Sequence, residues 1–375
     1  GGLARLERDV FARGATMLFV MYGINDICWG YCQDEQTQHR FLDAIREIVL
    51  RAIQRGLRVY VCSYPVTAAD PNTSEDSVLQ ALSDQAMEIS AALGGRAIDV
   101  QRQTRAIQRA LWAWNERTDE AHKLRLHNEL DQIHLNRLGH RAVAFAILKT
   151  LDAPDEVSSV IIDVGRSISL PIPPLALAPI RRAMARLGVP TRACSDGMQP
   201  TPIAIDVMGA TISNLRGDRD RLTFERLDEG LPITLGPDAL FATLPWIPFA
   251  DELDRYVLTV RNLPSGKYQI EVDGREIGTA SSNQLASGVN LTFMIPRPWD
   301  YGGPWDVKSI ALGSLTEARQ KIDEAWQLLS EFLQRDGSTP SLLDGLRDAR
   351  QRLEALQEQI VQPSALTFAV QRTPE

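Results

Sequence analysis

Residues 16–26 read TMLFVMYGIND, and this stretch decides the fold class. The run over residues 16–22 carries no charge and ends at Gly23, which is typical of a strand buried on both faces of a sheet. Two similar runs follow at residues 57–62 and 97–100, each after one or two glycines that can end a helix. The chain therefore begins with the pattern of a parallel sheet.

Segments with apolar residues at helical spacing separate these runs. We expect helices over residues 37–55, 76–92, 103–123 and 140–151. Strands that alternate with helices predict an α/β fold, in which functional groups lie in loops beyond the carboxyl ends of the strands. The loop that starts at Gly23 is in such a position.

The pattern changes after Pro154. Residues 157–163, 222–224, 256–263, 267–272 and 275–279 are predicted strands, several of them joined by tight turns such as Asp273-Gly274. From residue 315 the apolar residues return to helical spacing, which predicts an antiparallel helical hairpin. We expect the hairpin to pack on its own domain; dimerisation is the alternative. We expect four parts: an α/β domain over 1–152, an antiparallel β region over 153–312, a hairpin over 313–361 and a tail over 362–375. A proline-rich insertion at 165–205, with a short helix at 175–187, interrupts the β region.

Composition excludes several classes of protein. The chain has 375 residues and a net charge of −8, so it offers no chain-wide positive field for nucleic acid. Its longest charge-free stretches are too short to span a membrane. Four cysteines are too few and too irregular to indicate a redox compartment. We interpret Cys28 and Cys32 as small buried apolar residues; the alternative, a metal site with His39, lacks the four-ligand spacing of structural zinc.

Two motifs could carry chemistry. Gly23-Ile24-Asn25-Asp26 presents the Asn25 carboxamide above the predicted sheet, where an N–H donor could hold an oxyanion, although an ordinary turn or helix cap has the same residues. Asp131-Gln132-Ile133-His134 places a carboxylate three residues before an imidazole, so that Asp131 could orient His134 as a general base. A structural loop histidine is the alternative for His134, and His140 is interpreted as structural.

Together, Gly-x-Asn-Asp and Asp-x-x-His-x-Asn-x-x-Gly-His resemble the third and fifth blocks of the SGNH/GDSL hydrolases, and residues 3–10 are similar to that family as well. The β region resembles the tail of an exported, planctomycete-type subgroup. The resemblance implies a three-layer, flavodoxin-like α/β core in which Asn25 donates to the oxyanion, His134 is the base and Asp131 orients it. Gly23 and Asp26 also match the third block, where the resemblance implies a role in the shape of the loop rather than in catalysis.

The family's nucleophile block precedes Gly-x-Asn-Asp, but no serine occurs before Gly23. The first strand and the nucleophile are therefore expected upstream of residue 1, and the 375 residues alone are expected to be inactive. Ser63 is a candidate substitute, but it lacks the flanking glycines of a sharp nucleophile elbow. We expect a serine ester hydrolase that needs no cofactor or metal and acts on a small-molecule or carbohydrate ester. The alternative is a non-catalytic carbohydrate- or protein-binding module on the same scaffold.

Overall fold

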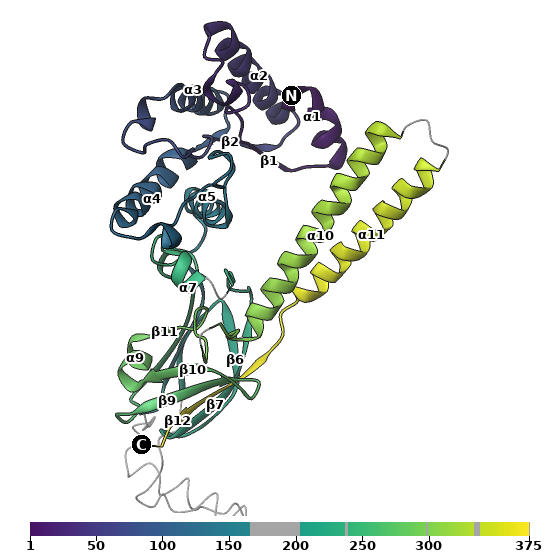
Figure 1. The fold of residues 1–375 in the computed structure, drawn as a ribbon. Coiled ribbons are helices and arrows are strands. Elements are labelled where there is room, and N and C mark those ends of the chain that lie inside the picture. Colours follow the sequence, from purple (N-terminus) through teal and green to yellow (C-terminus); the bar gives the residue numbers. More distant parts are fainter. Residues whose placement is uncertain (166–202, 237–238, 298, 334–337, 375) are drawn as a thin grey trace, which may run out of the picture. The chain divides into compact units, whose positions relative to one another are not determined.

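The computed structural model describes residues 1–165, 203–236, 239–297, 299–333 and 338–374 (Figure 1). These residues form two compact units. The first, here called the α/β unit, consists of Gly1–Pro154 and Ala239–Phe249, and the β-rich unit contains the other described residues. The helix predicted at 175–187, with most of the insertion around it, lies outside the described residues.

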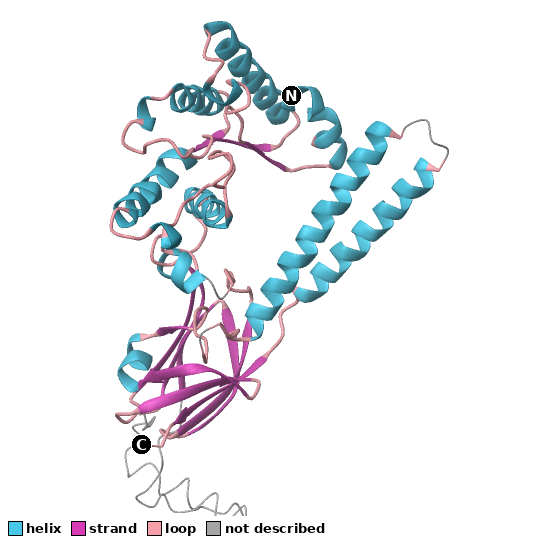
Figure 2. Ribbon diagram, viewed as in Figure 1, coloured by secondary structure: helices cyan, strands magenta, loops and turns pink. Residues whose placement is uncertain are grey.

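The sheet of the α/β unit contains three parallel strands in the order β1-β2-β3: β1 (Met17–Val20), β2 (Arg58–Cys62) and β3 (Arg96–Ile98). Figure 2 shows these short strands among the helices that surround them. The predicted α/β fold with a parallel sheet is confirmed. The helices are α1 (Gly2–Asp9), α2 (Glu35–Gln54), α3 (Val78–Ala92), α4 (Val100–Asn115), α5 (Arg137–Thr150) and α7 (Ala239–Ala242).

Both faces of this sheet are buried. Val59 and Val61 of β2 pack with apolar residues of α2 and α3, whereas Tyr60 and Cys62 pack with Ile98 and with Ala146 of α5. Successive residues of a strand point to opposite faces, so one strand supplies both cores. Helices therefore cover the sheet on two sides, and the loops after its strands are left to carry the site.

Two predicted boundaries are wrong for local reasons. The strand predicted at 97–100 ends at Ile98, because the Asp99 carboxylate accepts the Arg102 backbone N–H at 3.0 Å and caps α4. The helix predicted at 103–123 ends at Asn115, whose carboxamide bonds both the N–H and the carbonyl of Leu124. The chain then forms a separate 3₁₀ turn at Glu120–His122.

The β-rich unit contains two sheets, with strand orders β10-β9-β12-β7-β6 and β11-β8-β4-β5. Most neighbouring strands are antiparallel, as predicted, but β4 and β8 are parallel. The elements are β4 (Glu156–Asp163), β5 (Ile203–Met208), β6 (Ala210–Gly217), β7 (Arg221–Asp228), α8 (Phe249–Glu252), β8 (Arg255–Arg261), β9 (Lys267–Val272), β10 (Arg275–Ser281), α9 (Ser282–Ser287), β11 (Val289–Asn290) and β12 (Leu366–Arg372). Residues 362–375, expected only as a tail, supply β12 between β7 and β9.

Two long helices, α10 (Pro304–Phe332) and α11 (Thr339–Ile360), pack against each other. Arg319 pairs with Glu354 at 2.8 Å and Arg350 with Asp323 at 3.2 Å between them. Helix α10 starts at Pro304, whereas the hairpin was predicted to start at residue 313. Its first turn carries Trp305, which is buried in the core between the sheets. Among the described residues, no helix has the length and apolar character needed to cross a membrane.

Among the described residues of the β-rich unit, Asp163, Asp254 and Asp306 are buried aspartates. Asp254 accepts the Ile233 backbone N–H through Oδ1 at 2.8 Å, while its Oδ2 has no hydrogen-bond partner. Burial, and then the charge of Asp306, raise the pKa of Asp254 to about 7. The folded state therefore binds a proton that the unfolded chain releases near pH 4, and stability falls as the pH rises from about 4 to about 7.

We expect Asp254→Asn to raise the free energy of unfolding at pH 8, by up to about 4 kcal/mol, and to change it little at pH 4.5. Chemical denaturation at both pH values measures this difference. Asp218→Asn is the matched control in the same unit, because backbone hydrogen bonds lower the pKa of Asp218, so its loss should destabilise the protein at pH 8. Equal destabilisation of Asp254→Asn at both pH values would contradict this account.

Candidate active site

The first motif forms a turn immediately after β1. Gly23 has a φ of +140°, which L-residues rarely adopt, and a Cβ there would lie 3.3 Å from Leu79 Cδ1. Its carbonyl accepts the backbone N–H groups of Asp26 and Ile27 at 3.0 and 3.2 Å. Because backbone groups close this turn, the exposed carboxamide of Asn25 is not needed as a cap.

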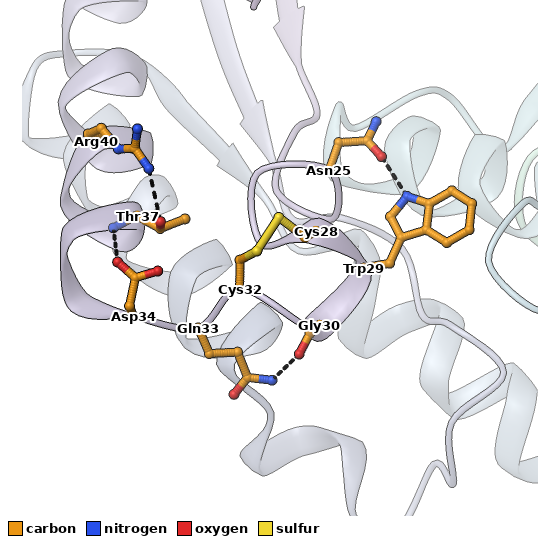
Figure 3. Close-up of a disulfide and its surroundings, with 9 residues drawn as sticks. All are labelled: Asn25, Cys28, Trp29, Gly30, Cys32, Gln33, Asp34, Thr37 and Arg40. Atoms are coloured by element: carbon orange, nitrogen blue, oxygen red, sulfur yellow. Dashed lines mark hydrogen bonds between the residues drawn. A yellow bond between two sulfur atoms is a disulfide. The ribbon is translucent and has the colours of Figure 1, made fainter.

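The Asn25 carboxamide is instead bound by an indole. Trp29 Nε1 donates a hydrogen bond to Asn25 Oδ1 at 2.8 Å (Figure 3). An indole N–H can only donate, so it selects the oxygen end of the amide. Figure 3 shows the amide nitrogen on the side away from the indole, where its two N–H groups can serve another acceptor.

A disulfide closes the loop that carries Trp29. Cys28 and Cys32 are bonded, with their Cα atoms 5.2 Å apart (Figure 3). The interpretation of both residues as buried apolar cysteines is therefore wrong, and the thiols of the alternative metal site are consumed; His39 lies 3.5 Å from Glu35 instead. The described residues contain no cluster of three or more His, Cys, Asp or Glu side chains that could hold a metal ion.

The second motif is a loop that ends at α5. Asp131 Oδ1 accepts the backbone N–H groups of Ile133 and His134 at 2.9 and 2.8 Å, and its Oδ2 lies 2.8 Å from His134 Nδ1. The Ile133 and His134 N–H groups, and then the imidazole, lower the pKa of Asp131 to about 2. An ionised carboxylate at Nδ1 requires a proton on that nitrogen. In the neutral ring, Nε2 is then the atom that can accept a proton.

The structure brings the two motifs together through one residue. The Trp29 and His134 rings meet edge to face, with centroids 6.2 Å apart and planes at 83°. Trp29 thus contacts Asn25 by a hydrogen bond and His134 by its ring. Trp29 was not predicted as a site residue, because the motif specifies Asn25 and Asp26 but no aromatic residue after them.

The backbone around His134 is fixed from both sides. Asn128 N–H donates to the His134 carbonyl at 2.8 Å, and the Asn136 carboxamide caps α5 by accepting the Gly139 N–H at 3.0 Å. A Cβ at Gly139 would overlap the Leu126 carbonyl oxygen, so this glycine allows the helix to approach the loop closely. His140 is exposed on the first turn of α5.

Ser63 is not available as a nucleophile. Its buried hydroxyl lies at the end of β2, donates to Asp99 Oδ1 at 3.2 Å and accepts the Gln101 N–H at 2.8 Å. Every serine of the α/β unit has such a structural contact away from His134: the hydroxyl partners are Asp99 for Ser63, Arg105 for Ser74, Gln80 for Ser77, Tyr64 for Ser83 and Arg96 for Ser90.

An open groove of about 710 Å³ borders Asn25 and Asp26. Its walls include the first residues of the chain, Tyr22, and the apolar side chains of Phe41 and Ile45 from α2. The strand β1 lies at the edge of the sheet. Asn25 therefore borders a groove and lies in the loop that follows this edge strand.

Residues 2–142 match the model of the GDSL-like Lipase/Acylhydrolase family. They form a GDSL-like lipase/acylhydrolase domain. No curated protein shows significant similarity to the chain.

Among solved structures, the gut microbial diltiazem-metabolizing enzyme BT4096 is similar in fold, with a TM-score of 0.68 and 18% identity over 99% of this chain and 87% of that chain. A single-residue variant of Axe2, an acetyl xylan esterase from Geobacillus stearothermophilus, matches 40% of this chain and 65% of its own, at 18% identity and a TM-score of 0.30. The acetyl xylan esterase AlAXEase matches 40% of this chain and 74% of its own, at 18% identity and a TM-score of 0.33. The chain thus spans about two thirds of Axe2.

The packing of Gly139 predicts that Gly139→Ala lowers the free energy of unfolding by about 1–3 kcal/mol, because the new methyl group forces α5 away from the Leu126 carbonyl. Gly313→Ala is the control, since a Cβ at that helical position meets open space, and it should be neutral or stabilise by up to about 1 kcal/mol. Thermal and chemical denaturation measure both changes. Equal stabilities for the two variants would contradict this packing.

Proposed function

We propose that the GDSL-like domain hydrolyses carboxylic esters through an acyl-enzyme, with His134 as the base, Asp131 as its orienting acid and Asn25 as an oxyanion donor. The observation that carries the proposal is that Trp29 contacts both Asn25 and His134, which supports a single site for the proposed donor and base. Membership of the GDSL-like domain supports ester hydrolysis as its chemistry. The binding-module alternative is not favoured, because it gives no reason for an oriented imidazole beside an oriented carboxamide.

Each of these residues has its own role in the proposed reaction. A serine hydroxyl attacks the ester carbonyl while His134 Nε2 takes its proton, and the ionised Asp131 stabilises the imidazolium through Nδ1. The Asn25 Nδ2 group donates to the oxygen of the tetrahedral intermediate. The imidazolium then returns its proton to the leaving alcohol, and water, activated by the same imidazole, releases the acid. These steps require no cofactor.

We infer that the attacking serine comes from a segment that precedes residue 1 in a longer protein. All five serines of the α/β unit are bound elsewhere, and the edge position of β1 would accept a further strand. The resemblance to the SGNH/GDSL hydrolases agrees with this, because the nucleophile block of that family comes before Gly-x-Asn-Asp. The proposed substrates are small-molecule esters, with O-acetyl groups on carbohydrates as the first class to test.

The site assignments are tested in the full-length protein with p-nitrophenyl acetate and an acetylated xylo-oligosaccharide. We expect His134→Ala to abolish turnover and Asn25→Ala to lower kcat about 10²–10³-fold. His122→Ala is a matched control, because His122 Nδ1 lies 2.6 Å from Asp119 at the same three-residue spacing in an exposed turn. Unchanged rates for His134→Ala and Asn25→Ala, or an equal loss for His122→Ala, would reject the assignments.

The position of the nucleophile is tested by labelling the full-length protein with a fluorophosphonate that modifies active serines. Peptide mass spectrometry should find the label upstream of residue 1, and the 375 residues alone should neither react nor hydrolyse the esters. A label on Ser63, or ester turnover by the isolated chain that Ser63→Ala abolishes, would overturn the proposal.

A further inference from the structure

We propose that Trp29 is a positioning residue of this site: its indole N–H sets the orientation of the Asn25 carboxamide, and its ring restrains the His134 imidazole. This inference rests on the proposed function and extends it to a residue outside the motif. The 2.8 Å hydrogen bond and the 6.2 Å ring contact are its direct evidence.

The hydrogen bond decides which end of the carboxamide faces the substrate. A carboxamide has an acceptor end and a donor end, and a half-turn about its last bond exchanges them. Only the orientation with Oδ1 on Trp29 leaves Nδ2 free to donate to an oxyanion. Without the indole N–H, the Asn25 amide can turn its oxygen toward the developing negative charge, which repels it.

The loop backbone holds the indole in this position. Cys28, Trp29 and Gly30 follow one another with φ values of +48°, +58° and +98°, a left-handed run that only surrounding contacts can maintain in non-glycine residues. The Trp29 N–H donates to the Ile24 carbonyl at 2.8 Å, and the Cys32 N–H donates to the Ile27 carbonyl at 2.9 Å. The Cys28–Cys32 disulfide closes the same segment. Three different contacts thus direct one side chain.

The exposure of Trp29 separates this role from a packing role. Trp29 is 48% exposed, whereas Trp305, which fills the core of the β-rich unit, is 1% exposed. A ring that is half in solvent contributes little to a hydrophobic core. Its strained backbone and its two contacts with Asn25 and His134 are therefore better explained by positioning than by folding.

The test compares Trp29→Phe with the wild type in the full-length protein. Phenylalanine keeps an aromatic ring but removes the N–H, so we expect kcat for p-nitrophenyl acetate to fall about 10-fold or more with KM within about twofold. In an Asn25→Ala background, Trp29→Phe should have much less effect, because the amide that it orients is gone. Thermal unfolding confirms that each variant is folded.

The disulfide is tested by the double variant Cys28→Ser/Cys32→Ser, which should lower kcat in the same way while KM is retained. Unchanged kcat in this variant would remove the disulfide from the proposal. Because Trp29 itself borders solvent, a change confined to KM in Trp29→Phe would show that the ring binds substrate, and would overturn the positioning role.

The outcomes distinguish this inference from the proposed function. If His134→Ala and Asn25→Ala abolish or strongly reduce turnover while Trp29→Phe matches the wild type, the site stands and the positioning role is wrong. If His134→Ala and Asn25→Ala leave turnover unchanged, the proposed function fails first. Losses from Trp29→Phe that are equal and additive in the presence and absence of Asn25 would also reject the positioning role.

Discussion

The indole of Trp29 is the contact on which the site depends, because it joins two segments that are about a hundred residues apart in the chain. One ring accounts for the orientation of the Asn25 amide and touches the His134 imidazole. The Asp131 carboxylate lies 2.8 Å from Nδ1 of that imidazole, and two backbone N–H groups lower its pKa. Asp131, His134, Trp29 and Asn25 therefore form a continuous series of contacts.

The parallel sheet explains why these segments can meet. Alternate residues of β2 enter cores on opposite faces, so helices cover both sides of the sheet. The loops beyond the strands and the loop before α5 are then free to carry Asn25 and His134. A glycine is needed in each of the two motifs. Gly23 adopts the positive φ of the turn after β1, and Gly139 lets α5 approach the Leu126 carbonyl closely.

Sequence patterns predicted much of this architecture. The uncharged run ending at Gly23 and the spacing of later apolar runs indicated the parallel sheet, because burial on two faces leaves a clear mark on composition. The hydrogen bond between Asp131 and His134 could also be predicted from the sequence, since their three-residue spacing in a loop brings the carboxylate and the imidazole together. The assignment of Asn25, His134 and Asp131 to catalytic roles remains a proposal.

Other features had no local signal. The Cys28–Cys32 disulfide and Trp29 depend on a left-handed backbone that no propensity predicts, and β12 is paired with strands from distant parts of the chain. The early end of α4 depends on a contact between the Asn115 side chain and Leu124. Each of these features is decided by tertiary contacts rather than by the residues' own preferences.

The most direct measurement is a crystal structure of the full-length protein after reaction with a phosphonate that mimics the tetrahedral intermediate. The account predicts the phosphoryl oxygen within hydrogen-bond distance of Asn25 Nδ2, with Trp29 Nε1 still bonded to Asn25 Oδ1 and His134 Nε2 facing the modified serine. An adduct whose phosphoryl oxygen is held elsewhere, with the Asn25 amide turned away from it, would contradict the account.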